Sequence, residues 1–140
     1  MKQKCNLIII SVVILIICLI VFNYPMRALF QNIARNTKNS FLCPFSIDND
    51  NCYAYIAMYK QNPELCNKVS ETSTWKDQCY MDLGGRMNNL DLCMKITKEN
   101  QKSQCITSIA MKRNDTNICL SIKDVSLQLT CTSWVNGNKN

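Results

Sequence analysis

The sequence predicts an all-α protein in which an N-terminal transmembrane helix precedes a short array of disulfide-linked αα-hairpins. Three observations lead to this prediction. The run LIIISVVILIICLIVF at residues 7–22 carries no charge. Cysteine recurs at nearly regular intervals with the same neighbours, at positions 52, 79, 105 and 131. The cysteine-rich part also lacks the alternation of apolar and polar residues that is typical of half-buried strands.

Residues 1–22 contain the predicted membrane anchor. With Cys5 and Asn6 the uncharged stretch reaches about 18 residues, which is near the lower limit for crossing the hydrocarbon layer. A cleaved signal peptide is the main alternative, and a buried core segment is a weaker one. The stretch FNYPMRAL that follows offers no small-residue cleavage site, and Cys18 lacks the small preceding residue of a lipidated cysteine. These features favour an uncleaved signal anchor.

Residues 23–40 form the predicted juxtamembrane linker. Met26, Leu29, Phe30 and Ile33 recur at helical spacing, and Pro25 stands where the first turn of a helix tolerates proline. Two interpretations stay open for this segment. It is either an amphipathic helix that lies on the membrane surface or a helical spacer that continues the span.

Residues 41–136 contain three copies of one pattern. The copies are CYAYIAMYKQNPELCNKV (52–69), CYMDLGGRMNNLDLCMKI (79–96) and CITSIAMKRNDTNICLSI (105–122). Each has an apolar residue four places after its first cysteine, then a small residue, an Asn or Asp, and a second cysteine at the fifteenth position. An interval of this size, sustained along the chain, indicates a repeat array.

Each copy is interpreted as a longer helix followed by a helix of about two turns. Asn62, Asn89 and Asp115 supply the predicted N-caps of the short helices, and Pro63 occupies the first position after the first of them. Gly84-Gly85 is expected to weaken or kink its helix. Residues 41–47 resemble a second helix without its first, and residues 131–135 a first helix without its second. These segments are the predicted ends of the array, followed by a disordered tail at 137–140.

The repeat also predicts how the eight cysteines of this domain pair. In an antiparallel hairpin, the two cysteines of one copy are offset along the helices by roughly 9 Å, which exceeds the limit of about 7 Å between bridged Cα atoms. The second cysteine of one copy and the first of the next lie level. The predicted pairs are Cys43–Cys52, Cys66–Cys79, Cys93–Cys105 and Cys119–Cys131.

The cysteines and the charges indicate a compartment. An even number of cysteines within about 100 residues is typical of oxidising compartments, which places the C-terminal domain outside the cytoplasm and leaves Cys5 and Cys18 unpaired. Residues 1–38 carry five basic and no acidic groups, whereas residues 39–140 carry 11 basic and 10 acidic groups. The basic excess therefore flanks the membrane, and the domain lacks the footprint of a nucleic-acid binder.

No catalytic constellation is evident, and we expect neither an enzyme nor a cofactor or metal site. The chain has no histidine, its closest domain cysteines are nine residues apart, and no phosphate-binding glycine loop occurs. A metal site made from cysteine alone is a minor alternative. Asp77 with Asp82, and Asp48 with Asp50, are explained by caps and solvated charges. Asn114-Asp115-Thr116 fits both a glycosylation acceptor and the cap between helices.

The aromatic side chains offer the candidates for partner binding. Tyr53 and Tyr80 occupy the same position of the repeat, which favours packing between units. Tyr55, Tyr59, Trp75 and Trp134 are the predicted partner-binding residues, because aromatics commonly anchor protein interfaces.

The pattern C-Y-x-x-I-A…N-P-x-L-C-x-K-V and its copies, over residues 40–135, resemble tandem cysteine-bearing helical repeats of membrane-anchored or secreted prokaryotic proteins. The architecture is similar to disulfide-bridged Sel1-like and tetratricopeptide arrays, although those repeats have about 34–36 residues. Repeat arrays usually bind peptides or proteins. Together with the apolar run and the lack of a catalytic constellation, this favours a protein-binding role or an envelope scaffold, with the membrane contacted through residues 7–22, an unknown protein partner and no small-molecule substrate. A secreted effector after signal cleavage and an extracytoplasmic thiol-redox enzyme are the alternatives.

Overall fold

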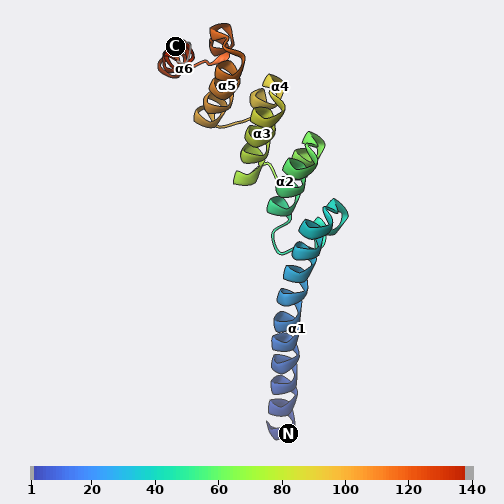
Figure 1. Cartoon of the computed structure of the whole chain (residues 1–140). Helices are drawn as coiled ribbons and strands as arrows, with labels where there is room; N and C mark the ends of the chain where they lie inside the picture. The colour runs from blue at the N-terminus through green and yellow to red at the C-terminus, as the bar shows by residue number, and fades with distance from the viewer. Residues whose placement is uncertain (1, 138–140) are drawn as a thin grey trace.

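The computed structural model describes the backbone of residues 2–137 and the side chains of residues 10–19 and 23–137. Every regular element in this part of the chain is helical, which confirms the predicted all-α class. The elements are α1 (Lys2–Thr37), η1 (Ser40–Phe45), α2 (Asn49–Lys60), η2 (Pro63–Lys68), α3 (Thr74–Met87), α4 (Leu90–Met94), α5 (Glu99–Arg113), η3 (Thr116–Ser121) and α6 (Val125–Gly137), where η marks a 3-10 helix. They stack in a column on the end of α1, with α6 farthest from it (Figure 1).

Helix α1 is continuous from the apolar run into the cysteine-rich part. Pro25 lies inside this helix and not in the first turn of a new one, so that expectation is wrong. The continuity favours the helical spacer over a helix that turns to lie on the membrane surface. The described side chains of residues 10–19 are exposed. Among the described residues, Ile10–Thr37 is the one stretch long and apolar enough to cross a membrane, although a signal sequence meets the same criteria.

The C-terminal part of α1 packs against η1, the short element that follows it. Lys38 has the left-handed φ of 56°, and the Asn39 N–H donates to the carbonyl of Ala34 at 3.0 Å. The Asn39 side chain then caps η1 by accepting from the N–H of Phe41. The prediction that residues 41–47 lack a partner helix is therefore wrong, because residues 23–37 supply it. Gly137 belongs to α6, and residues 138–140 of the predicted disordered tail lie outside the described residues.

The same turn ends each of the long helices α1, α2, α3 and α5. The residues with a left-handed φ are Lys38, Gln61, Asn88 and Asn114. The next residue in each case donates its N–H to the carbonyl five residues earlier at 3.0 Å, and its side chain caps the following short element. The predicted caps at Asn62, Asn89 and Asp115 are thus confirmed, as is Pro63 at the start of η2.

The short elements differ from the prediction in their helical type. Three of them are 3-10 helices of six residues, and α4 is an α-helix of only five residues. Hydrogen bonds from residue i+3 to residue i hold these short segments, and 3-10 turns are common next to the ends of α-helices and as connectors. The carbonyls of Cys43, Cys66 and Cys119 accept such bonds at the ends of η1, η2 and η3.

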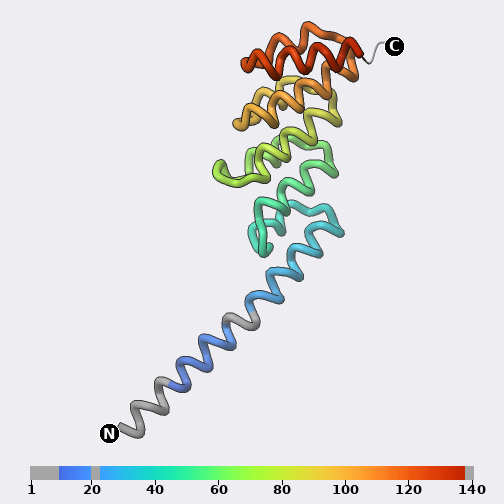
Figure 2. Tube along the Cα trace, turned by 90° about the vertical axis from the view of Figure 1, so that its left-hand side faces the viewer, coloured from blue at the N-terminus to red at the C-terminus, as the bar shows by residue number. Residues whose placement is uncertain are grey.

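Four disulfides join each short element to the next long helix. The Cα–Cα distances are 5.5 Å for Cys43–Cys52, 5.8 Å for Cys66–Cys79, 5.6 Å for Cys93–Cys105 and 5.8 Å for Cys119–Cys131. All four predicted pairs are confirmed in this structure. The sulfur atoms are buried in the core of this column of helices. The apolar residues four places after each first cysteine are buried with them, namely Ile56, Leu83, Ile109 and Val135. Figure 2 shows the backbone of the successive helices and short elements stacked beside one another.

The two adjacent glycines do not interrupt α3, which runs from Thr74 to Met87. Gly84 instead permits a close approach. A Cβ atom on Gly84 would lie 2.9 Å from the Cys105 sulfur and 3.1 Å from the Cys93 sulfur. A Cβ atom on Gly85 would meet only the Ser108 hydroxyl, at 4.0 Å. The glycine at 84 is therefore required by the neighbouring disulfide, whereas the glycine at 85 is not.

This contrast predicts opposite effects for two neighbouring substitutions. Gly84→Ala should lower the free energy of unfolding by about 1–3 kcal/mol, because a disulfide cannot move aside as a flexible side chain can. Gly85→Ala should raise it by about 0.5–1 kcal/mol, because alanine favours the helix. Urea denaturation of both variants under non-reducing conditions measures the difference. Two effects of the same sign would contradict the packing role of Gly84.

Candidate partner-binding groove

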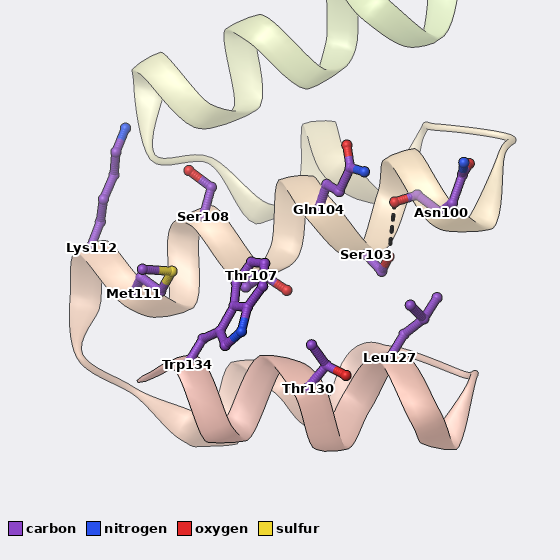
Figure 3. A pocket seen from close by; sticks show the side chains of 10 residues that line it. All are labelled: Asn100, Ser103, Gln104, Thr107, Ser108, Met111, Lys112, Leu127, Thr130 and Trp134. Atoms are coloured by element: carbon purple, nitrogen blue, oxygen red, sulfur yellow. Dashed lines mark hydrogen bonds between the residues drawn. The ribbon is translucent and has the colours of Figure 1, made fainter. Parts of the chain in front are cut away.

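A groove of ≈ 540 Å³ lies between α5 and α6, at the end of the column away from α1. Met111, Leu127 and Trp134 give it apolar walls, and hydroxyl and amide side chains line the rest. Figure 3 shows Trp134 reaching from α6 toward Thr107 and Met111 on α5, with Leu127 and Thr130 facing the same space. Such a mixture of an apolar surface with a few polar groups is typical of binding sites.

Helical spacing explains why these side chains share one face. Gln104, Ser108 and Lys112 follow one another at intervals of four on α5, and Thr130 and Trp134 do so on α6. The Cys119–Cys131 disulfide ties α6 to η3, which packs against α5. The opposite faces of α5 and α6 are buried in the column through residues such as Ile109 and Val135. The groove is thus the outward side of two helices whose inward sides are fixed.

A second, smaller hollow of ≈ 300 Å³ lies between α3 and α5. Gln104, Ser108 and Lys112 line both hollows, so the two share α5 as their common wall. The Lys112 ammonium donates to the carbonyl of Gly85 across the second hollow. Asp82 and Arg86 add opposite charges there. The two hollows together offer a surface over three successive long helices.

The structure does not bring the four predicted aromatic residues together. Trp134 is 59% exposed and lines the groove, whereas Trp75 is 37% exposed in the first turn of α3. Tyr55 and Tyr59 lie at the other end of the column, beside the end of α1. The Lys38 ammonium is 4.9 Å from the Tyr55 ring centre and 4.2 Å from that of Tyr59, and it donates to the Tyr55 hydroxyl.

The aromatic pair at equivalent repeat positions packs as predicted. Tyr80 is 3% exposed in the core, and Tyr53 packs against the core from its edge. Each ring also has a lysine nearby, with Lys68 at 5.6 Å from Tyr53 and Lys95 at 5.5 Å from Tyr80. Burial raises the pKa of both phenols above its ordinary value. These two tyrosines therefore belong to the scaffold.

The acidic residues also have structural partners. Asp48 caps α2, as predicted, and Asp82 accepts from the Gln78 amide. Asp77 is neither a cap nor solvated, which corrects the expectation for this residue. It is 5% exposed and accepts hydrogen bonds from the Thr97 N–H and hydroxyl, each at 2.8 Å, and from the Lys98 N–H at 3.2 Å. Asp50 accepts from the Ser70 N–H and hydroxyl at the equivalent place.

No metal-binding cluster of acidic residues and cysteines occurs within the described part of the chain. The eight disulfide cysteines are at most 2% exposed. Cys18 is a free and exposed thiol on α1, and the side chain of Cys5 lies outside the described residues. Asp115 caps η3 and Asn114 has a left-handed φ, so the cap interpretation of Asn114-Asp115-Thr116 is confirmed.

Trp134 was named from the sequence as a candidate partner-binding residue, and the structure places it in the groove, but Met111, Leu127 and Thr130 were not named. The intervals of four residues on α5 and α6 could have predicted these residues. Once the face with the cysteines is assigned to the core, side chains at intervals of four on the opposite face are expected to point outward. No protein-family model, curated protein or solved structure matches this chain.

Proposed function

We propose that the protein is a membrane-anchored, extracytoplasmic helical-repeat protein that binds another protein through the groove of α5 and α6. The groove carries the binding part of this proposal, since it combines an exposed tryptophan with apolar walls on a fixed pair of helices. Aromatic side chains in such surroundings are frequent anchors of protein interfaces. The recurring turns and disulfides of successive units support the repeat architecture.

The proposed location rests on α1 and on the disulfides. The apolar stretch of α1 matches the thickness of a bilayer, and four disulfides suit an oxidising compartment. Because α1 continues into the first unit, the column stands on the anchor without a flexible linker (Figure 1). A rigid mount of this kind would hold the groove at a set distance from the bilayer, which suits a scaffold that positions its partner.

Two alternatives have different consequences. A secreted effector would lose its apolar segment near residue 24, so the mass of the protein isolated from its host discriminates it from an anchored protein. A thiol-redox enzyme needs an accessible disulfide or a reactive thiolate. The burial of all four disulfides opposes exchange with an external thiol. Counting free thiols in the native protein separates this alternative from the scaffold.

A photocrosslinking residue in place of Trp134 tests the binding surface in the native membrane. We expect one discrete adduct with another protein, and we expect Thr130→Arg to reduce its yield about tenfold, because a long cation would fill the groove beside the anchor. Thr130 is exposed, so this substitution should leave the fold intact.

The matched control places the same crosslinker at Leu120. This residue is 68% exposed on η3 and does not line the groove. An adduct of equal yield from Leu120, or an adduct from position 134 that Thr130→Arg does not reduce, would contradict the proposed site. The absence of any adduct in the host membrane would count against a protein partner altogether.

A further inference from the structure

The corner between η1 and α2 lies beside the apolar segment of α1. Ile47 lines one shallow cleft together with Ile16, Leu19, Asn23, Tyr24 and Arg27. The Arg27 guanidinium fixes this arrangement by donating from Nε and Nη2 to the carbonyl of Ser46, at 3.2 and 3.0 Å. The chain therefore returns along α1 after η1 and brings Ile47 back toward the start of the linker segment.

The height of this corner can be compared with the bilayer. Arg27 lies five residues beyond Phe22, the last residue of the apolar run, which corresponds to about 8 Å along the helix. The headgroup layer on each side of the hydrocarbon is about 5–8 Å thick. If α1 spans the membrane with its apolar run in the hydrocarbon, the corner that Arg27 holds lies within the headgroup layer.

The exposed side chains of the corner suit that layer. Tyr24 is 67%, Phe45 51% and Ile47 36% exposed. Tyrosine is enriched at the boundary between membrane and water, and arginine there keeps its charged end in the headgroups. Asp48 follows directly, but its carboxylate is engaged as the cap of α2. The apolar side chains therefore dominate the contact.

We propose that the η1–α2 corner, with Ile47 at its tip and Phe45 behind it, rests in the phospholipid headgroup layer as a second membrane contact. This proposal depends on the anchoring of α1 in the proposed function. A helix alone leaves the column free to rotate about its axis and to tilt. A second contact to one side of α1 restricts both motions, so the corner would set the direction in which the groove of α5 and α6 faces.

Tryptophan scanning in vesicles tests this contact. The full chain, with Trp75→Phe and Trp134→Phe, receives a single tryptophan through Ile47→Trp and is reconstituted into vesicles of phosphatidylcholine brominated in the upper acyl chain. We expect emission to fall on the order of twofold relative to unbrominated vesicles, because an interfacial side chain lies about 5–10 Å into the boundary between headgroups and chains. Vesicles that also contain phosphatidylglycerol should give the same result, since the contact is mainly apolar.

Phe41→Trp is the matched control. Phe41 lies at the start of η1 and is 75% exposed, but it is near the end of α1, beside Asn39, and should be unquenched. The quenching of Phe45→Trp should be intermediate between that of Ile47→Trp and that of Phe41→Trp. Phe45→Trp also replaces Ile47→Trp if that variant fails to fold. Phe45 suits this purpose because its ring is exposed and lies 5.8 Å from that of Phe30.

Leu15→Trp, reconstituted into vesicles brominated near the end of the acyl chain, distinguishes the two proposals, because this residue lies at the middle of the apolar run. Quenching at position 15 without quenching at 47 or 45 beyond that of 41 would overturn the second contact and leave the anchor in place. Absence of quenching at position 15 would overturn the anchor and the second contact together.

Discussion

Replacing Cys93 and Cys105 together by alanine should lower the free energy of unfolding by about 3–5 kcal/mol. Loss of a disulfide that closes a loop of this length removes about 3 kcal/mol in the chain-entropy model. The sulfur atoms also fill the space beside Gly84, so their loss leaves a cavity that adds to the cost. The short elements have no stability of their own, since isolated helices of one or two turns do not persist in water. Guanidinium denaturation of the full chain in detergent measures the change.

Cys119 and Cys131 provide the matched control for this prediction. Both disulfides have a sequence separation of 12, so chain entropy gives them the same contribution. The Cys93–Cys105 unit has neighbours on both sides, whereas α6 ends the described column. We therefore expect a smaller decrease in the free energy of unfolding when Cys119 and Cys131 are both replaced by alanine. The decrease should be about 1–2 kcal/mol smaller than for Cys93 and Cys105, as nearest-neighbour stacking predicts. Equal losses would show that the units do not stabilise one another.

The disulfide pairing was predictable because it follows from a rule of geometry applied to a visible period. The two cysteines of one copy are offset across a hairpin, and those across the intervening loops lie level. The fixed apolar positions around them were predictable for the same reason. Ile56, Leu83, Ile109 and Val135 are all fully buried. Most of the fold could thus be predicted from the period of the sequence and from the size of the side chains at each repeated position.

The unit formed with α1 was not predictable from that period. Its long helix has Leu29 where the others have cysteine, and its turn at Lys38 lies closer in sequence to the next turn, at Gln61, than the later turns lie to one another. The cause is the start of α2, which lies only three residues before Cys52, whereas α3, α5 and α6 begin five or six residues before their cysteines; this also shortens the first disulfide loop. A pattern defined by cysteine could not detect this long helix, because it has no cysteine at the matching position. The small residue Ala34 and the cap Asn39 were the available signals.

The partner surface was only partly predictable, because exposure depends on what packs against each residue. Tyr55 and Trp134 look alike as isolated aromatic residues in the sequence. In the structure, Tyr55 is covered in part by Lys38 and Arg35, while Trp134 stands at the edge of a groove. The neighbours of Tyr55 come from α1, whose role in the domain was not foreseen. The incomplete interpretation of α1 therefore also led to the wrong expectation that Tyr55 and Trp134 have similar surroundings.

Asp77 shows how a carboxylate can look functional and yet serve the fold. Burial alone would raise the pKa of Asp77, but hydrogen bonds from the Thr97 N–H and hydroxyl and from the Lys98 N–H outweigh it, and the pKa lies below its ordinary value of 3.8. The carboxylate joins the first turn of α3 to the chain that follows α4, and so closes the open end of the hairpin. Asp50 with Ser70 repeats the arrangement in the preceding unit.

Asp77→Asn should therefore lower the free energy of unfolding at neutral pH by about 2–3 kcal/mol, because one buried N–H group would face an amide N–H₂ and lose its acceptor. Asp50→Asn should cost less, about 0.5–1.5 kcal/mol, since Asp50 is only partly buried and its hydrogen bonds from Ser70 lie at the exposed surface. Denaturation of the two variants side by side measures both losses. The reverse order would contradict the argument from burial.

The pH dependence gives the same prediction a second readout. A carboxyl whose pKa is lowered by folding stabilises the native state above its unfolded pKa of 3.8, and this stabilisation is lost as the pH falls through the folded value. The difference in free energy of unfolding between the wild-type protein and Asp77→Asn should thus stay constant from neutral pH to about pH 5. Below about pH 4 this difference should become smaller. A gap that does not narrow in acid would mean that the variant loses packing and not the charged hydrogen bonds. Asp77 would then be a space-filling residue, and the link it makes between α3 and Thr97 would not depend on its charge.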